Sequence, residues 1–141
     1  MINTYVGLPA IMGRLEVAAT AAVNNGANEL VRDAQEYAPV DTGALAAGIH
    51  TTGARADGNG VTAHVQTGAE SSEYAIPVHE GSEAHIIEAK NGKALFWPGA
   101  SHPVKAVLHP GAPPNEFLEV PLLSMASRFQ AKCKAAMRAA F

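Results

Sequence analysis

One tripeptide in the sequence, Asp41-Thr42-Gly43, matches a known catalytic motif. Aspartic proteases use this tripeptide to supply a carboxylate, and their chemistry needs two carboxylates that share one proton. Because the chain contains the tripeptide once, such an enzyme would have to be a homodimer of the retroviral type. A structural alternative needs no second copy: the Asp41 carboxylate would accept hydrogen bonds from backbone N–H groups two and three residues later, as a helix N-cap or an Asx-turn.

The residues around the tripeptide favour the structural alternative. A predicted long helix runs into the motif, whereas in retroviral-type proteases the motif follows a β-strand. Pro39 has no N–H and disfavours a helical conformation of the residue before it, so the helix should end there. Gly43 permits a left-handed backbone. A three-residue match is a weak signal by itself, and we predict a structural corner composed of Pro39, Asp41, Thr42 and Gly43.

Metal binding is the second chemistry to consider, because the chain has six histidines. His79, Glu80 and His85 are close enough in sequence to meet in one loop as zinc ligands. However, the residue four positions after His79 is Glu83 rather than a second histidine, and the glycine and serine after Glu80 disfavour a helix there. Histidines in such positions are more often exposed or bonded to the backbone, and we predict neither a metal nor a cofactor.

The composition is that of a globular protein without strong bias. The 141 residues are 48% hydrophobic, 16% charged and 6% aromatic, with a net charge of −3, which gives no basic footprint for nucleic acid. The length favours one domain over 1–141. The single cysteine, Cys133, excludes an intrachain disulfide, and no nucleophile elbow surrounds it. No apolar run reaches the ~18 residues of a membrane helix, and the first residues lack the basic start of a signal peptide.

A long helix is predicted over 8–37, where alanine and larger apolar residues recur at helical spacing. Pro9 suits its first turn. Asn24-Asn25-Gly26 is a weak point at which the helix would bend or break. A wide face of small residues is typical of a core or a subunit interface, and we favour that over a ligand site.

After the corner, 44–47 allows about one helical turn. The segments 49–55 and 61–67 predict an antiparallel hairpin, because a strong turn signal at 57–60 separates them. A polar loop is expected over 68–72.

The next segment, 74–82, returns to apolar residues, but Pro77 keeps it out of a central strand. A second hairpin is predicted between 85–89 and 94–97, because Asn-Gly lies at the centre of 90–93.

A further strand is expected at 104–108, and the proline-rich segment 109–115 is an extended connector into a second helix over 117–141. Pro121 belongs in the first turn of that helix or kinks it. Its apolar stripe supplies a candidate helix interface at Leu122, Phe129 and Cys133. The basic residues beside the stripe either complement the helix dipole or contact an acidic partner; they are Arg128, Lys132, Lys134 and Arg138.

Several separated segments form a recognisable ordered set. They are Ala38-Pro39-Val40-Asp41-Thr42-Gly43-Ala44-Leu45, Ile49, Tyr74-Ala75, Val78-His79-Glu80-Gly81-Ser82, Lys93-Ala94-Leu95-Phe96, His109-Pro110-Gly111 and Phe117-Leu118. Together they resemble a phage family: the tail-component or neck proteins that long-tailed phages encode in the head-to-tail joining region. The chain departs from the family pattern at Ser82, where the family has Thr, and at Ala46-Ala47-Gly48, which lacks the usual basic and Ser residues.

The resemblance implies an α+β fold with a long N-terminal helix and a C-terminal helix. These would pack on an antiparallel sheet of about four to five strands with long loops. It also implies a non-enzymatic virion protein of the neck or tail, assembled in the host bacterial cytoplasm. Its subunits would form a closed ring of six copies that joins the adaptor and stopper (head-closure) proteins to the tail terminator or tail tube. Double-stranded DNA would pass through the bore without sequence-specific binding, and no membrane would be involved.

Ring subunits contact their neighbours through two different surfaces, and loops rich in Gly, Pro and His are suited to reach a neighbour. We therefore expect a candidate inter-subunit loop that contains His79, Glu80, Gly81, Ser82, His85, His109, Pro110 and Gly111.

Overall fold

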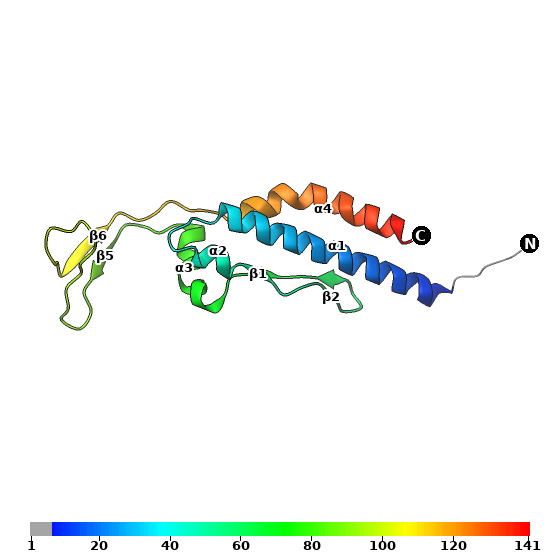
Figure 1. The fold of residues 1–141 in the computed structure, drawn as a ribbon, viewed down its shortest axis with the longest axis horizontal. Helices are drawn as coiled ribbons and strands as arrows, with labels where there is room; N and C mark the ends of the chain where they lie inside the picture. Colours follow the sequence, from blue (N-terminus) through cyan, green and yellow to red (C-terminus); the bar gives the residue numbers. More distant parts are fainter. Residues whose placement is uncertain (1–6) are drawn as a thin grey trace, which may run out of the picture.

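The computed structural model describes residues 7–141 and confirms an α+β fold. An elongated body contains two long helices that lie side by side, and a narrow two-stranded arm projects from one end of the body (Figure 1). The helices are α1 (Leu8–Tyr37), α2 (Ala44–Gly48), α3 (Ala69–Glu80) and α4 (Glu119–Ala139). The strands are β1 (His50–Thr51), β2 (Arg55–Ala56), β3 (Val61–Thr62), β4 (Val65–Gln66), β5 (His85–Glu88) and β6 (Ala106–His109). Within the described part, no helix has the length and apolar character to cross a membrane.

The first helix, α1, has the bounds that the sequence predicts. Pro9 stands in its first turn, where a missing N–H costs nothing. The helix ends when the N–H of Ala38 bonds to the carbonyl of Ala34, and Pro39 then prevents a further turn. The expected weak point does not break it, because α1 is continuous through Asn24-Asn25-Gly26.

Two contacts explain why α1 tolerates this segment. The side-chain oxygen of Asn24 accepts a hydrogen bond from the N–H of Ala54 (3.2 Å), which ties the following β-hairpin to α1. Gly26 faces α4, where a Cβ would overlap the ring of Phe129. The close approach of the two helices therefore favours a residue that otherwise costs a helix roughly 1 kcal/mol relative to alanine.

The last helix, α4, packs along α1, and its buried row differs from the predicted stripe in the first turns. Pro121 and Met125 are buried there, whereas Leu122 is 50% exposed. Phe129 and Cys133, farther along, are half-buried. The sequence could not separate these alternatives, because Pro121 and Leu122 are adjacent apolar residues and either could face α1.

Ion pairs join α4 to α1 on the surface beside this apolar contact. The Lys132 ammonium donates a hydrogen bond to the Glu29 carboxylate (2.6 Å). Arg128 lies 3.8 Å from Glu29 and 4.0 Å from Asp33. The Lys132 hydrogen bond holds the pKa of the Glu29 carboxyl below its ordinary value. The acidic partner of these two basic residues is thus α1 of the same chain.

The buried core lies where α1 ends and α2, α3 and the start of α4 meet. Phe117 and Ile49 are its largest fully buried side chains. The side-chain amide of Gln35 donates a hydrogen bond to the carbonyl of Ile49 (3.1 Å), which fixes the exit of α2. The remaining buried members of this cluster are Ala34, Ala38, Leu45 and Ala75.

The hairpin predicted after the corner is confirmed, in two short sections that lie along α1. β1 pairs antiparallel with β4, and β2 pairs antiparallel with β3. At the turn, the Asp57 carboxylate accepts hydrogen bonds from the N–H groups of Asn59 and Gly60, both at 3.0 Å. Val61, Ala63 and Val65 are half-buried and alternate with exposed residues.

The polar loop predicted over 68–72 is wrong, because residues from Ala69 onward form α3. The next segment, for which the sequence argued only against a central strand, continues this helix to Glu80. Ser71 lies in the first turn of the helix, where it is buried and its hydroxyl donates a hydrogen bond to the carbonyl of Gly68 (3.0 Å). Ala75 then packs in the core. Pro77 lies inside the helix, where its missing N–H leaves one backbone bond unmade. Burial of one face of α3 outweighs that loss, which local sequence preference does not reveal.

The second predicted hairpin has the right turn but the wrong partner strand. Asn91 and Gly92 form the turn with positive φ values of 56° and 71°. However, β5 pairs antiparallel with β6 rather than with 94–97, and Leu95 makes a single bridge to Val104. Over residues 7–141, the strands are thus divided among three two-stranded sheets instead of one continuous sheet.

Candidate functional site

The corner between α1 and α2 contains the tripeptide that resembled a catalytic motif. Gly43 adopts a left-handed conformation (φ 81°) directly before α2, and no side chain caps that helix. The Thr42 hydroxyl accepts a long hydrogen bond from the N–H of Ala44 (3.4 Å). The expectation that Asp41 caps the helix is therefore wrong, because α2 begins two residues too late for its carboxylate to be the N-cap.

The Asp41 carboxylate is exposed and lies between two helices. A retroviral-type protease presents this residue on a loop that leaves a β-strand, so the structural context differs from that of the enzyme. The position agrees with a corner whose shape depends on Pro39 and Gly43.

The histidines do not come together as a metal site. His79, on the last turn of α3, contacts the Phe117 ring edge-on, with ring centroids 5.3 Å apart. His85 and His109 face each other across β5 and β6, with ring centroids 5.1 Å apart. Over residues 7–141, no three His, Cys, Asp or Glu side chains are arranged to hold a metal ion.

The residues expected to form one inter-subunit loop instead belong to the end of α3 and to the arm. We define the arm as residues 82–112. His79 and Glu80 end α3, while His85 and His109 lie on the paired strands, with Pro110 directly after them. The structure therefore brings His85 and His109 together and leaves His79 in the body.

At the root of the arm, two segments of the backbone pair closely. Ser82 and Ala112 exchange backbone hydrogen bonds, both at 2.9 Å. Gly81 (φ 81°) and Gly111 (φ 86°) flank this bridge, and a Cβ at Gly111 would overlap the carbonyl oxygen of Ser82. Only glycine fits both the conformation and the space, so the arm leaves the body at a fixed place.

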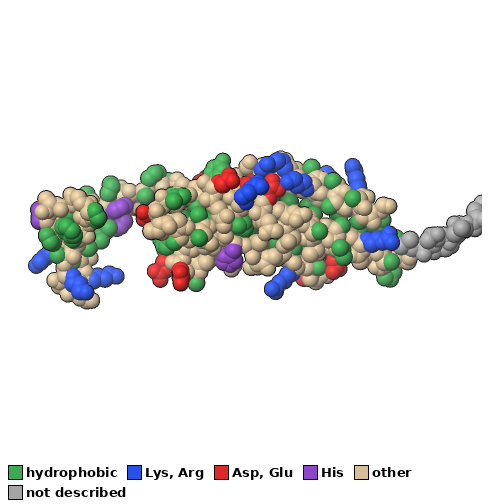
Figure 2. Space-filling view, in the orientation of Figure 1, with side chains coloured by type: hydrophobic (Ala, Val, Ile, Leu, Met, Phe, Trp, Pro, Cys, Tyr) green, Lys and Arg blue, Asp and Glu red, His purple; other side chains and the backbone are tan. Residues whose placement is uncertain are grey.

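The arm presents large apolar side chains to solvent. Those at 37% exposure or more are Ile86, Ile87, Phe96, Trp97 and Leu108. Its outer part, residues 89–105, which we call the tip, has three lysines and no acidic residue, and Figure 2 shows basic side chains at this end of the molecule. Exposed aromatic residues beside positive charges are typical of a surface that another protein covers. Sequence reasoning missed this surface, because it placed Phe96 and Trp97 in a strand.

Two large grooves lie on the body. The corner groove, with a volume of about 1080 Å³, runs between the corner with α2 and the first turns of α3. Its lining residues are 39–45, Ala47, Gly48, 68–71, Tyr74 and Val78. The second groove, of about 840 Å³, runs between α4, the end of α3 and the side of the hairpin that contains β3 and β4, next to α1. Grooves of this size accept several side chains, since pockets for drug-sized ligands have volumes of about 300–1,000 Å³.

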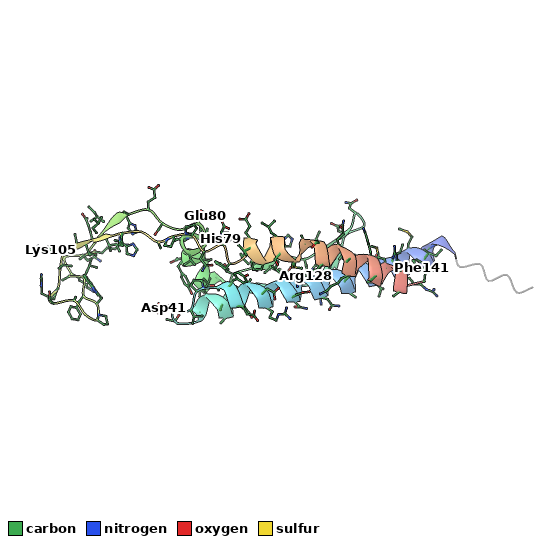
Figure 3. The ribbon with its side chains drawn as sticks, turned by 90° about the horizontal axis from the view of Figure 1, so that it is seen from above. Asp41, His79, Glu80, Lys105, Arg128 and Phe141 are labelled. Carbon is green, nitrogen blue, oxygen red and sulfur yellow. The ribbon has the colours of Figure 1, made fainter. Side chains whose placement is uncertain are left out.

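The arm points away from its own corner groove. Figure 3 places Lys105 at the far end of the arm and Asp41 at the body, and Figure 1, from a direction at right angles, shows the arm of β5 and β6 extending away from the body. The tip and the corner groove of one chain are thus free to meet different neighbours.

Comparison with known protein families gives a match over the first part of the chain. A family model described as "Bacteriophage HK97-gp10, putative tail-component" matches residues 10–89, which is more than half of the chain. The matched region runs from the first turn of α1 through the body to the end of β5. No curated protein and no solved structure matches the chain.

Proposed function

The chain belongs to this family of phage tail components, and from that premise we propose that it is a ring-forming subunit of the virion neck. In this proposal several copies close into a ring. The family resemblance of the sequence implies that the ring has six copies. The ring lies between the head-closure proteins and the tail terminator or tail tube. The observation that carries the proposal is the family match over α1, the corner, α3 and β5.

The shape of the chain supports assembly through two different surfaces. A closed ring needs a heterologous contact, in which one patch of a subunit meets another patch of the next. The arm offers exposed apolar side chains at one end, and the body offers grooves of a different form. If no other protein covered the arm, Phe96 and Trp97 would stay exposed to water, which would lower the solubility of the protein.

The charge distribution fits a conduit for DNA. The chain has a net charge of −3, and a ring of acidic subunits would not grip phosphates strongly, since DNA affinity depends on neutralising them with Lys and Arg. The lysines of the tip are an exception, and in this proposal they contact protein rather than the genome.

The proposal also makes the protein non-enzymatic. An aspartic protease would need Asp41 to meet its copy across a two-fold axis, whereas the proposed corner only connects α1 to α2. Asp41→Asn should therefore change no proteolytic activity of the purified chain. Pepstatin-sensitive cleavage at acid pH that disappears in Asp41→Asn would reverse this assignment.

The direct test is to remove the gene from the phage that encodes it. We expect DNA-filled heads and separate tails that fail to join, with joining restored by the wild-type chain. The purified chain, alone or with its neck partners, should form rings visible by mass photometry and electron microscopy. Normal, infectious particles without the chain would contradict the proposal.

A further inference from the structure

We propose that the arm tip of one copy docks in the corner groove of the next copy. This inference rests on the proposed function, since it identifies the neighbour that the ring requires. The occupant of the groove is a second copy of this chain, and the contact joins basic and aromatic side chains to an acidic, apolar groove.

Charge selects this groove for the tip. Lys90, Lys93 and Lys105 give the tip a charge of +3, and because the whole chain carries −3, the remaining residues carry −6. The corner groove is lined by the carboxylates of Asp41 and Glu70, with no Lys, Arg or His among its lining residues.

Two other grooves on the described body fit the tip less well. The groove beneath α4 has two histidines among its lining residues as well as two carboxylates. A smaller groove near the ends of α1 and α4 is lined by Arg14 and by no acidic residue, so it would repel lysine. Charge favours one docking arrangement over others mainly because like charges repel each other in the alternative arrangements.

The apolar surfaces also match. Phe96 is 67% exposed and Trp97 is 44% exposed on the tip, and Val40 is 78% exposed in the corner groove beside Tyr74 at 38%. Aromatic side chains that fill a pocket on the partner carry a large share of interface energy. Because the arm extends away from the body in both views, its own groove is out of reach and the contact joins different copies.

The test uses charge reversal in the full chain. An arm variant carries Lys90→Glu, Lys93→Glu and Lys105→Glu, and a groove variant carries Asp41→Lys and Glu70→Lys. All five side chains are exposed, so each variant should fold, as circular dichroism would verify. We expect each variant to weaken self-association, measured by sedimentation, by at least about tenfold, and the combined variant to regain it.

Matched controls separate the contact from general charge effects. Arg55→Glu, Lys134→Glu and Arg138→Glu together change the net charge as the arm variant does, at exposed positions that line none of the three grooves. Glu73→Lys changes a charge on α3 outside the corner groove. Both controls should associate as the wild type does.

A photocrosslink identifies the docking place directly. With p-benzoylphenylalanine at position 96, mixing isotope-labelled and unlabelled chains should give intermolecular links to peptides from 39–48 or 68–78. Links to the groove beneath α4, a wild type that stays monomeric at every concentration, or a combined variant no better than the single ones would each overturn the inference. Head-to-tail joining that depends on the chain yet persists in the groove variant would also overturn it, while leaving the proposed neck function intact.

Discussion

The packing of α1 on α4 makes a sharp prediction at Gly26. Substitution of alanine for glycine inside an exposed part of a helix normally stabilises it by about 1 kcal/mol. At Gly26 the added Cβ would overlap two atoms of the Phe129 ring, and overpacking of this kind costs about 1–3 kcal/mol. The two effects oppose each other, so Gly26→Ala should destabilise the protein by about 1 kcal/mol, on the basis of these ranges.

The same helix contains a matched control. Gly13 is exposed, and a Cβ built on it meets no atom within 4 Å. Gly13→Ala should therefore stabilise the protein by about 1 kcal/mol. Urea unfolding followed by circular dichroism measures both changes, and a thermal scan should show shifts of about 4 °C in opposite directions.

A double-mutant cycle shows whether the ring is the cause. In a Phe129→Ala background the overlap is gone, so Gly26→Ala should become stabilising there. The reasoning is refuted if Gly26→Ala stabilises the otherwise wild-type chain as Gly13→Ala does. It is also refuted if Gly26→Ala destabilises both backgrounds equally.

Three further predictions concern charge, the corner and the arm. Glu29 has a lowered pKa in the folded state. Its ion pairs therefore stabilise the protein fully at pH values above the ordinary pKa of a glutamate, and this stabilisation is lost as the pH falls through the pKa of the folded state. Glu29→Gln should thus cost at most about 1 kcal/mol at pH 7 and nothing in strong acid, which urea titrations at both pH values would show. Asp41→Ala should change the free energy of unfolding by less than about 0.5 kcal/mol, since its carboxylate caps no helix; a loss near 1 kcal/mol would show that it braces the corner after all. Gly111→Ala should raise hydrogen exchange over 82–112 while leaving α1 protected, because the new Cβ meets Ser82 at the arm root; equal exchange in the two proteins would argue against a glycine-dependent root.

Local signals in the sequence were enough to predict the ends of α1 and the first hairpin. Pro9 and Pro39 restrict the backbone whatever surrounds them, and α1 has the predicted bounds. The acidic turn at 57–60 likewise forms its own hydrogen bonds through Asp57. These features depend on residues close in sequence, which is why they could be predicted.

The errors arose where distant residues decide the outcome. α3 forms around Pro77 because Ala75 and Ser71 are buried against other elements, and local preference argued for a loop. The turn at Asn91-Gly92 is predicted correctly, but β5 pairs with β6, which lies farther along the chain than the predicted partner 94–97. The corner was predicted from Pro39 and Gly43, whereas the role of Asp41 depended on where α2 begins.

The exposed apolar tip was also beyond sequence reasoning. Phe96 and Trp97 follow an apolar pattern that suits a buried strand, and only the arrangement of the arm shows them to be exposed. Such exposure indicates that another protein covers these side chains. The apolar pattern in the sequence of one chain cannot distinguish contact with a partner from burial within the chain.

Cryo-electron microscopy of intact phage particles at the head–tail junction tests the central claim most directly. The account predicts a closed ring into which copies of this chain fit, with the arm of each copy lying on the corner of the next and DNA or an open bore at the centre. A particle in which this chain is absent would contradict it, and so would a two-fold dimer in which the Asp41 carboxylates face each other.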